Sequence, residues 1–372
     1  MISGLSKLKR ALARLVTTLL TVGLLATPAL LAAAPAHAGS AGLSWRDLET
    51  GSEAQFRGLA PVSRHVAWVS GTEGTVLRTT DGGRHWADVS PGGDTTHLQF
   101  RDIEAWDADH AVIMSIGAGR ASRIYRTDDG GRTWKLGFKN RGKNAFYDCM
   151  SFWDRRHGIA MSDPVHGKFR IITTNNGGRS WTTRSPAGMP PALEGEFGFA
   201  ASGTCVVTAG DEDAWIASGG AAARVFHTAD KGKTWSVVDT PLVRSDAGGI
   251  FSLAVRDKQT LVAVGGDFEK PNKSADTAAY SEDGGATWTA GGDLDGYRSG
   301  AAFLPRTAST GSPSVGVVAV GPTGTNVSFD GGVTWKSVRD GAFDAVECTL
   351  DGACWASGPD GRVALLDGLK KR

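Results

Sequence analysis

The sequence lacks the residue spacings that mark metal, redox and nucleotide chemistry. It contains no CxxC, HExxH or His-x-His pattern and no glycine-rich nucleotide fingerprint, and its histidines are scattered. Only four of its 372 residues are cysteine. We therefore expect no metal site and no cofactor.

An excess of charge of either sign is also missing. The chain has 40 Lys and Arg against 39 Asp and Glu. Removing residues 1–38 takes four basic residues and no acidic ones, which leaves 36 against 39 and a net charge of −3. Such a balance gives no electrostatic footprint for nucleic acid or for an anionic membrane, so neither is expected as a partner.

Long apolar runs are absent except near the N-terminus. Lys7, Lys9, Arg10 and Arg14 precede an apolar run over residues 15–31, and Ala36-His37-Ala38 follows as a small-x-small cleavage site. No cysteine follows the run and no twin-arginine pair precedes it. We expect residues 1–38 to be a cleaved signal peptide and the mature chain to be secreted or extracytoplasmic, without a stable membrane anchor. The alternative is an uncleaved anchor.

One eight-residue pattern, Ser/Thr-x-Asp-x-Gly-x-x-Trp, occurs six times in the rest of the chain. The copies lie at residues 79–86, 127–134, 174–181, 228–235, 281–288 and 328–335. Successive copies are 48, 47, 54, 53 and 47 residues apart, and the third has Asn176 in place of Asp. A regular period of this size indicates a repeat architecture.

Each copy predicts a β-hairpin. Asp bonds the backbone N–H groups just ahead of it, and Gly accepts positive φ without steric cost. Polar and apolar residues alternate before and after the turn, and Trp is expected to pack beneath it as a buried anchor. Identical chemistry repeated six times favours a structural role over a catalytic or metal-binding one. The residues are Asp81, Trp86, Asp129, Trp134, Asn176, Trp181, Asp230, Trp235, Asp283, Trp288, Asp330 and Trp335.

The pattern resembles the Asp-box, or bacterial neuraminidase repeat. This repeat occurs in sialidase-like β-propellers, in other glycoside hydrolases and in the photosystem II stability/assembly factor family. Trp68-Val69-Ser70-Gly71, followed by the segment at residues 76–83, is most similar to the last of these. The resemblance covers the chain after residue 42 and implies a propeller fold more strongly than it implies an activity.

The repeats predict an all-β fold, a seven-bladed β-propeller of four-stranded antiparallel blades. In the second repeat the strands are expected at residues 100–106, 111–116, 122–127 and 133–137. Blades are expected to start near Phe56, Phe100, Phe146, Phe197, Phe251, Tyr297 and Phe343, with these aromatic rings in the core. The last blade lacks a fourth strand, and residues 43–48, which read like a strand after an Asp-box, are expected to supply it. Residues 39–372 would then form one domain.

The cysteines suggest disulfides. Cys348 and Cys354 flank the Asp351-Gly352 turn, so we predict that they are joined across a hairpin. Cys149 and Cys205 lie on early strands of adjacent repeats, and the sequence leaves open whether they are joined.

The propeller resemblance implies that first-strand entrances and the loops between second and third strands share one face, opposite the Asp-box turns. This face would gather a specific set of polar residues. The entrances contribute Arg57, Arg101, Asp102, Tyr147, Asp148, Glu196, Arg298 and Asp344, and the loops contribute Arg120, Asp163, His166, Asp267, Glu269 and Lys270. His166 lies in a turn-like segment and is expected to be an exposed loop residue.

Arg57, Arg101 and Arg298 are similar in placement to the arginine triad with which sialidases hold a carboxylate. The sialidase Arg-Ile-Pro segment and the Tyr–Glu nucleophile pair have no clear counterpart here. The expected ligand-binding residues are Arg57, Arg101, Asp102, Tyr147, Asp148 and Arg298, with the three arginines at one mouth of the channel. The competing interpretation is that they are solvated charges at the rim or pair with Asp102 and Asp148.

Two functions follow. The first is a monomeric, non-enzymatic binding or assembly module outside the cytoplasm, which docks a peptide or protein partner through a carboxylate-bearing segment. The alternative is a glycoside hydrolase acting on extracellular carbohydrate, which needs two carboxylates about 5 to 9.5 Å apart. Asp148 together with Asp163 or Asp267 would supply them.

Overall fold

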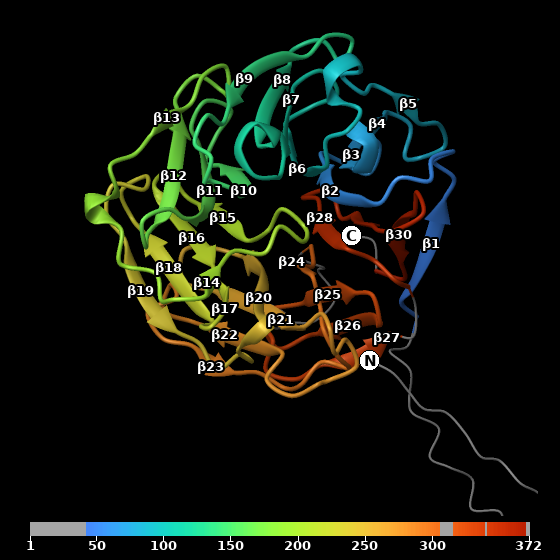
Figure 1. Ribbon diagram of the computed structural model, residues 1–372. Coiled ribbons are helices and arrows are strands. Elements are labelled where there is room, and N and C mark those ends of the chain that lie inside the picture. Colours follow the sequence, from blue (N-terminus) through green and yellow to red (C-terminus); the bar gives the residue numbers. More distant parts are fainter. Residues whose placement is uncertain (1–41, 306–314, 339–340, 370–372) are drawn as a thin grey trace, which may run out of the picture. The chain divides into compact units, whose positions relative to one another are not determined.

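The computed structural model describes residues 42–305, 315–338 and 341–369. These residues form a ring of seven antiparallel sheets, a seven-bladed β-propeller (Figure 1). The predicted signal segment, residues 1–38, lies outside the described residues. Within the described ranges, no helix has the length and apolar character needed to cross a membrane.

The first three blades each contain four consecutive strands. Blade 1 consists of β2 (Phe56–Pro61), β3 (Ala67–Gly71), β4 (Val76–Thr79) and β5 (Ala87–Asp88). Blade 2 consists of β6 (Phe100–Ala105), β7 (Ala111–Ser115), β8 (Arg123–Thr127) and β9 (Lys135–Lys139). Blade 3 consists of β10 (Tyr147–Phe152), β11 (Gly158–Pro164), β12 (Phe169–Thr174) and β13 (Thr182–Thr183). Short 3-10 turns lie in the connections: η1 (Thr72–Gly74), η2 (Gly93–Thr95), η3 (Gly119–Ala121) and η4 (Pro186–Gly188).

The later blades include the irregular part of the ring. Blade 4 consists of β15 (Val206–Ala209), β16 (Asp213–Ala217), β18 (Arg224–Thr228) and β19 (Ser236–Asp239). Blade 5 consists of β20 (Ser245–Val255), β21 (Leu261–Asp267), β22 (Ala278–Ser281) and β23 (Thr289–Ala290). Blade 6 consists of β24 (Gly300–Phe303), β25 (Val317–Gly321), β26 (Gly324–Ser328) and β27 (Lys336–Val338). Blade 7 consists of β28 (Ala345–Cys348), β29 (Cys354–Ser357), β30 (Val363–Asp367) and β1 (Ser44–Leu48).

Blade 7 is closed by the N-terminal strand, as the sequence predicts. Strand β1 pairs antiparallel with β30, with Ser44 opposite Asp367 and Leu48 opposite Val363 (Figure 1). Trp45 turns inward, where its ring packs on Phe343 with centroids 5.0 Å apart. Pairing of β1 with β30 covers the edge of β30 that would otherwise be unpaired, and it joins the N-terminal strand to the last blade.

The prediction that blade 4 starts near Phe197 is wrong. Strand β14 (Glu196–Phe197) instead pairs with β17 (Gly219–Gly220), which in turn pairs with β20, so both short strands extend the sheet of blade 5. The first strand of blade 4 begins only at Val206. Residues 198–205 between β14 and β15 are therefore free to leave the blade, and they cross the ring.

The six repeated turns connect the third and fourth strands of blades 1 to 6 and share one hydrogen-bond pattern. In the first turn, Thr79 Oγ1 accepts from Gly83 N at 2.9 Å and Asp81 Oδ1 accepts from His85 N at 3.0 Å. The corresponding Ser or Thr and Asp or Asn accept the same two bonds in the other five turns. Each carboxylate or amide thus satisfies the backbone of its own turn.

The tryptophans of these turns are less buried than the sequence predicts. Trp235 is buried at 8 % exposure, whereas the other five are only partly buried. They lie between blades: Trp86 packs edge-on against Trp355 of blade 7, and Trp134 packs edge-on against Trp68 of blade 1. The fully buried partners, Trp68 and Trp355, come from second strands. The turn tryptophan therefore connects its blade to the preceding one.

Two disulfides are present among the described residues. Cys348 and Cys354 face each other across the β28–β29 hairpin, with Cα atoms 4.0 Å apart. Cys149 of β10 is joined to Cys205, which directly precedes β15. The second bridge connects blade 3 to the end of the segment that crosses the ring, and it closes a span of 56 residues.

Candidate functional site

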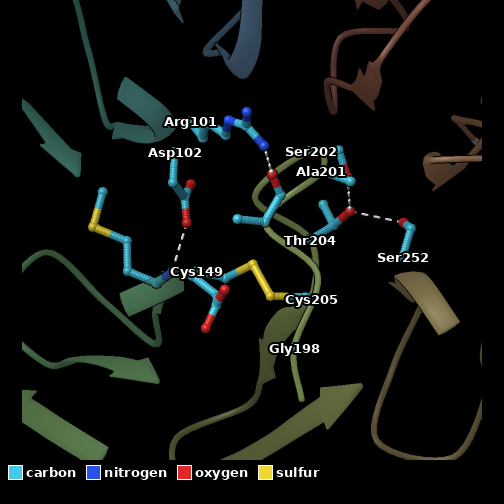
Figure 2. Close-up of a disulfide and its surroundings, with 12 residues drawn as sticks. Arg101, Asp102, Cys149, Gly198, Ala201, Ser202, Thr204, Cys205 and Ser252 are labelled. Carbon is cyan, nitrogen blue, oxygen red and sulfur yellow. Dashed lines mark hydrogen bonds between the residues drawn. A yellow bond between two sulfur atoms is a disulfide. The ribbon is translucent and has the colours of Figure 1, made fainter. Parts of the chain in front are cut away.

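Residues 198–205, which we call the strap, run between the surrounding blades to the Cys149–Cys205 disulfide (Figure 2). At its start, Gly198 N donates to Asp163 Oδ1 of blade 3 at 2.8 Å. In its middle, Ser202 Oγ donates to the carbonyl oxygen of Ser299, at the start of blade 6, at 2.7 Å. Its end is fixed by the Cys149–Cys205 disulfide. The strap is thus attached to blades on different sides of the ring.

Two of the predicted arginines bind the strap. Arg101 Nη1 donates to Ala200 O at 3.0 Å, and Arg57 Nη1 donates to Ala201 O at 3.5 Å. The guanidinium of Arg57 also lies 3.6 Å from Asp344 Oδ1. Burial, together with the neighbouring charge of Arg57, lowers the pKa of Arg101 to about 10. Arg57 and Arg101 thus both donate to the strap, and Asp344 is the acidic partner of Arg57.

An aromatic wall stands beside the arginines. Phe199 of the strap stacks on Phe251 with ring centroids 3.8 Å apart and an interplanar angle of 14°. Phe268 meets both rings edge-on, and Tyr297 packs on Phe251 with centroids 4.6 Å apart. Phe268 is 48 % exposed, so one face of its ring remains open to a ligand. The expectation that the aromatic residues at blade starts serve the core holds for Phe56 and Phe100, which pack between blades. Phe251, Tyr297 and Phe343 also line a cavity.

These groups line one cavity of about 410 Å³, which we call the arginine pocket. Arg57, Arg101 and Asp344 form its charged part, and its aromatic lining consists of Phe199, Phe251, Phe268, Tyr297 and Phe343. A small concave site with an apolar wall and few, convergent charged groups has the usual anatomy of a ligand site. Its chemistry suits a ligand with one anionic group and one apolar or aromatic group.

A second cavity of about 810 Å³, which we call the acidic cavity, is lined by Asp102, Glu104 and Glu347. Burial raises the pKa of Asp102 and of Glu347 well above the ordinary values, and each is raised further by the charge of Glu104. Burial also raises the pKa of Glu104, to about 7. Burial disfavours the charged form of all three carboxyl groups, so they hold protons that exposed carboxylates would release.

The strap separates the two cavities. Phe199, Ala200 and Ala201 line the arginine pocket, whereas Gly203 and Thr204 line the acidic cavity. Gly203 has φ +81°, and a Cβ there would lie 2.6 Å from Asp102 Oδ1. Only glycine allows the strap to pass this close to the channel carboxyl.

The other predicted ligand residues do not meet in the arginine pocket. Arg298 is fully buried in blade 6, where it donates to Asn326 Oδ1 at 2.9 Å and to Thr323 Oγ1 at 2.7 Å. The expectation that three arginines share one mouth is therefore wrong for Arg298. Tyr147 is buried against Phe138, and Asp102 faces the acidic cavity. Among the loop residues, Arg120, His166, Glu269 and Lys270 are exposed and line neither cavity.

The candidate catalytic carboxylates divide into a pair and a single residue. Asp163 N donates to Asp148 Oδ2 at 3.1 Å, and burial together with the charge of Asp163 raises the pKa of Asp148. Burial raises the pKa of Asp163 to about 6. Asp267 lies apart, bonded to Ser245 Oγ at 2.9 Å and facing Lys270. None of the three lines the arginine pocket or the acidic cavity.

Sequence reasoning missed Phe199 and Phe268 of the aromatic wall and missed the strap itself. One signal was available: the repeats that flank the strap are 54 residues apart, against 47 or 48 for most of the others. The extra residues include the small-residue stretch Ala200-Ala201-Ser202-Gly203, which has neither the alternation of a strand nor a turn dipeptide.

The acidic cavity predicts that stability falls as the pH rises through neutrality. The folded ring holds protons on Asp102, Glu104 and Glu347 that the unfolded chain releases near its ordinary carboxyl pKa values. Between about pH 4 and pH 7 the unfolded state therefore binds fewer protons, and the free energy of unfolding decreases with rising pH. For Glu104, whose pKa rises from 4.5 to about 7, the loss is at most about 3 kcal/mol, and water in the cavity reduces it.

Thermal unfolding between pH 5 and pH 8 tests this prediction. The melting temperature of the wild type should fall from pH 5 to pH 8. The melting temperature of Glu104→Gln should fall less over this range, so that at pH 8 it is higher than that of the wild type. The exposed Glu194→Gln is the control and should follow the wild type. Identical pH profiles for Glu104→Gln and the wild type would contradict the assignment. Below about pH 4 the sign reverses, because the pKa values of Asp81 and Asp129 are lowered to about 2 by bonds from His85 and Thr133 respectively.

No group of three or more His, Cys, Asp or Glu side chains within residues 42–305, 315–338 and 341–369 is arranged to hold a metal ion.

Comparison with known proteins shows similarity at the level of the fold. No protein-family profile matches the sequence, and no curated protein sequence matches it either. The solved structure of YCF48 bound to a D1 peptide is similar to the chain with a TM-score of 0.57 at 17 % identity, over 88 % of this chain and 97 % of that one. YCF48 from Cyanidioschyzon merolae is similar with a TM-score of 0.58 at 16 % identity, over 87 % and 98 %.

An enzyme is also among the similar structures. An ancestral GH74 enzyme matches with a TM-score of 0.61 at 14 % identity, over 86 % of this chain but only 46 % of its own length. The YCF48 structures and the GH74 enzyme both share the propeller fold with this chain. At these identities the similarities concern the propeller fold alone.

Proposed function

We propose that this protein is an exported, non-enzymatic docking propeller that binds a carboxylate-bearing segment of a protein partner in the arginine pocket. The observation that carries the proposal is the placement of Arg57 and Arg101 opposite Phe199, Phe251 and Phe268 in one cavity. The guanidinium groups receive the carboxylate, and the aromatic wall receives an adjoining apolar side chain. A chain terminus ending in an apolar residue presents both groups.

Charge and size support this ligand class. Asp344 is the only acidic side chain lining the described pocket, and its carboxylate faces Arg57 at 3.6 Å. Arg101 Nε and Nη2 both donate to Gln99 Oε1, which restrains the orientation of this guanidinium where it lines the cavity. A volume of about 410 Å³ admits one or two residues of a peptide rather than a folded surface.

A peptide ligand is further supported by the YCF48 structure, which holds a D1 peptide on a propeller of the same fold class. Export rests on the basic and apolar segment at residues 1–38 and on the presence of two disulfides, which suit an oxidising compartment.

Replacing either pocket arginine should weaken carboxylate binding. The probes are N-acetyl-Gly-Phe with a free C-terminal carboxylate and the same peptide as its C-terminal amide, titrated by calorimetry. Loss of one charge-assisted hydrogen bond costs about 1.5–3 kcal/mol, so Arg57→Ala and Arg101→Ala should each bind the acid roughly tenfold or more weakly. Arg132→Ala, which removes an exposed arginine of a repeated turn, is the control and should bind as the wild type does.

The amide separates the two parts of the site. It retains the aromatic side chain but lacks the charge, so it should bind weakly to the wild type and equally weakly to the arginine variants. Equal affinity of the wild type and the Arg57→Ala/Arg101→Ala double variant for the acid would refute the arginine site.

The second candidate is a glycoside hydrolase, and one observation favours it. Asp148 and Asp163 lie together and have raised pKa values, as a general acid requires. The pair is engaged by the strap through Gly198 N and lines neither cavity. Turnover of chromogenic glycosides that is lost in Asp148→Asn or Asp163→Asn would establish this function over docking.

A further inference from the structure

The strap already engages the groups that the arginine pocket offers to a ligand. Ala200 O and Ala201 O accept from Arg101 and Arg57, and Phe199 stacks on Phe251 of the aromatic wall. An extended segment with an aromatic side chain and two acceptor oxygens therefore occupies part of the site. It is a piece of the chain's own backbone.

The strap is held covalently at one end, and its middle is held by hydrogen bonds and packing. The Cys149–Cys205 disulfide and the bond from Gly198 N to Asp163 fix the two ends. Ala200, Ala201, Ser202 and Gly203 are small and buried, so hydrogen bonds and close packing, without a large side chain, hold this part. Beyond the arginine contacts, Ser202 Oγ donates to Ser299 O, and Leu253 N donates to Thr204 O. Thr204 Oγ1 also bonds to Ser252 Oγ (Figure 2).

We propose that the strap is an internal ligand of Arg57 and Arg101, and that the Cys149–Cys205 disulfide keeps it in place. This inference rests on the proposed function, because it concerns access to the same pocket. A carboxylate forms stronger hydrogen bonds with a guanidinium than a neutral carbonyl does. An incoming carboxylate therefore displaces the oxygens of Ala200 and Ala201, and the disulfide limits how far the strap withdraws.

The strap thus lowers the affinity of the arginine pocket. When a binding-competent arrangement is only partly populated, the apparent dissociation constant rises in inverse proportion to that population. Removal of the disulfide should increase the population in which the strap has left the arginines. Because the strap also separates the arginine pocket from the acidic cavity, its withdrawal joins the two spaces.

The experiment compares two variants that each lack one disulfide. The C149S/C205S variant releases the strap, and C348S/C354S, which removes the hairpin disulfide of blade 7, is the matched control. The probe is N-acetyl-phenylalanine, with N-acetyl-phenylalaninamide as its uncharged counterpart. C149S/C205S should bind the acid at least about fivefold more tightly than the wild type, since the competing population falls. C348S/C354S should bind as the wild type does.

Hydrogen exchange supplies a readout that needs no cysteine variant. In the wild type, saturating N-acetyl-phenylalanine should speed exchange at the backbone amides of residues 200–204, while the amide probe leaves their exchange unchanged. If near-ultraviolet circular dichroism shows that C149S/C205S does not fold, hydrogen exchange in the wild type tests the proposal by itself. Slower or unchanged exchange on adding the acid would overturn the proposal, because the strap would then be a fixed floor of the pocket.

The outcomes keep this inference separate from the proposed function. Binding of the acid that does not depend on Arg101 refutes the docking site and the inference together. Arginine-dependent binding with no response of the strap, in exchange or in C149S/C205S affinity, refutes the inference and leaves the docking site standing.

Discussion

Deleting residues 39–50 should lower the free energy of unfolding of the ring by more than any single substitution in the closing strand. The deletion removes β1, exposes the edge of β30 and takes Trp45 out of the core between blades 6 and 7. Trp45 also donates from Nε1 to Thr325 Oγ1 of blade 6 at 2.9 Å, so the strand joins two blades. Trp45→Ala alone should cost about 3–5 kcal/mol, as is usual for a buried tryptophan.

Arg46→Ala is the matched control for the closing strand. Arg46 is the next residue of β1 and points outward, where its exposed side chain pairs with Asp367. Exposed pairs of this kind contribute about 0–1 kcal/mol, so Arg46→Ala should stay close to the wild type in urea unfolding. A deletion variant with wild-type stability would show that the ring does not depend on β1 for closure.

Glu196→Ala is the second substitution expected to have a large effect. The side chain of Glu196 is fully buried and bonds Arg224 Nε at 2.9 Å, Ser218 Oγ at 2.6 Å and Leu193 N at 2.8 Å. Removing it leaves the guanidinium of Arg224 buried without its anion. Breaking a buried pair in this way costs about 3–5 kcal/mol, which urea unfolding would measure.

Two further variants define the origin of this effect. Glu194→Ala, two residues away and exposed, should change the free energy of unfolding by no more than about 0.5 kcal/mol. Replacing both partners, as in Glu196→Leu/Arg224→Leu, should recover much of the loss because no unpaired charge remains buried. A double variant as unstable as Glu196→Ala would indicate that packing, rather than the unpaired charge, determines the effect.

The repeated turns made the fold predictable from the sequence. Their hydrogen bonds run from a side chain to backbone groups two to four residues away, so short-range sequence contains all the information that the turn requires. Closure was also predictable, because Trp45 stands at the start of a segment that reads like the strand after Trp335 without a turn before it. A strand without its hairpin partner has to pair elsewhere.

The strap and Arg298 could not be predicted in the same way. Phe197 resembles the first residue of a blade, but it pairs with Gly219 of a short strand whose pairing no local pattern marks. Arg298 occupies an entrance position like that of Arg101, yet Thr323 and Asn326 bind it from the loop and strand that follow more than twenty residues later. Whether a guanidinium faces a cavity or the core depends on such distant partners. The sequence therefore predicted the charged part of the candidate site, Arg57 and Arg101, but neither the strap nor its Phe199.

The closing strand has a mechanical consequence. In the β1–β30 pair, Ser44 at the start of β1 lies opposite Asp367 at the end of β30 (Figure 1). Gly42 and Gly368 approach so closely that a Cβ on Gly368 would collide with the carbonyl oxygen of Gly42. A force that pulls residues 42 and 368 apart therefore acts across the pair from one end and breaks its hydrogen bonds one after another, as in unzipping. Strand β1 stabilises the closed ring against heat and denaturant. Under tension between residues 42 and 368, the β1–β30 pair would be the first part of the ring to separate.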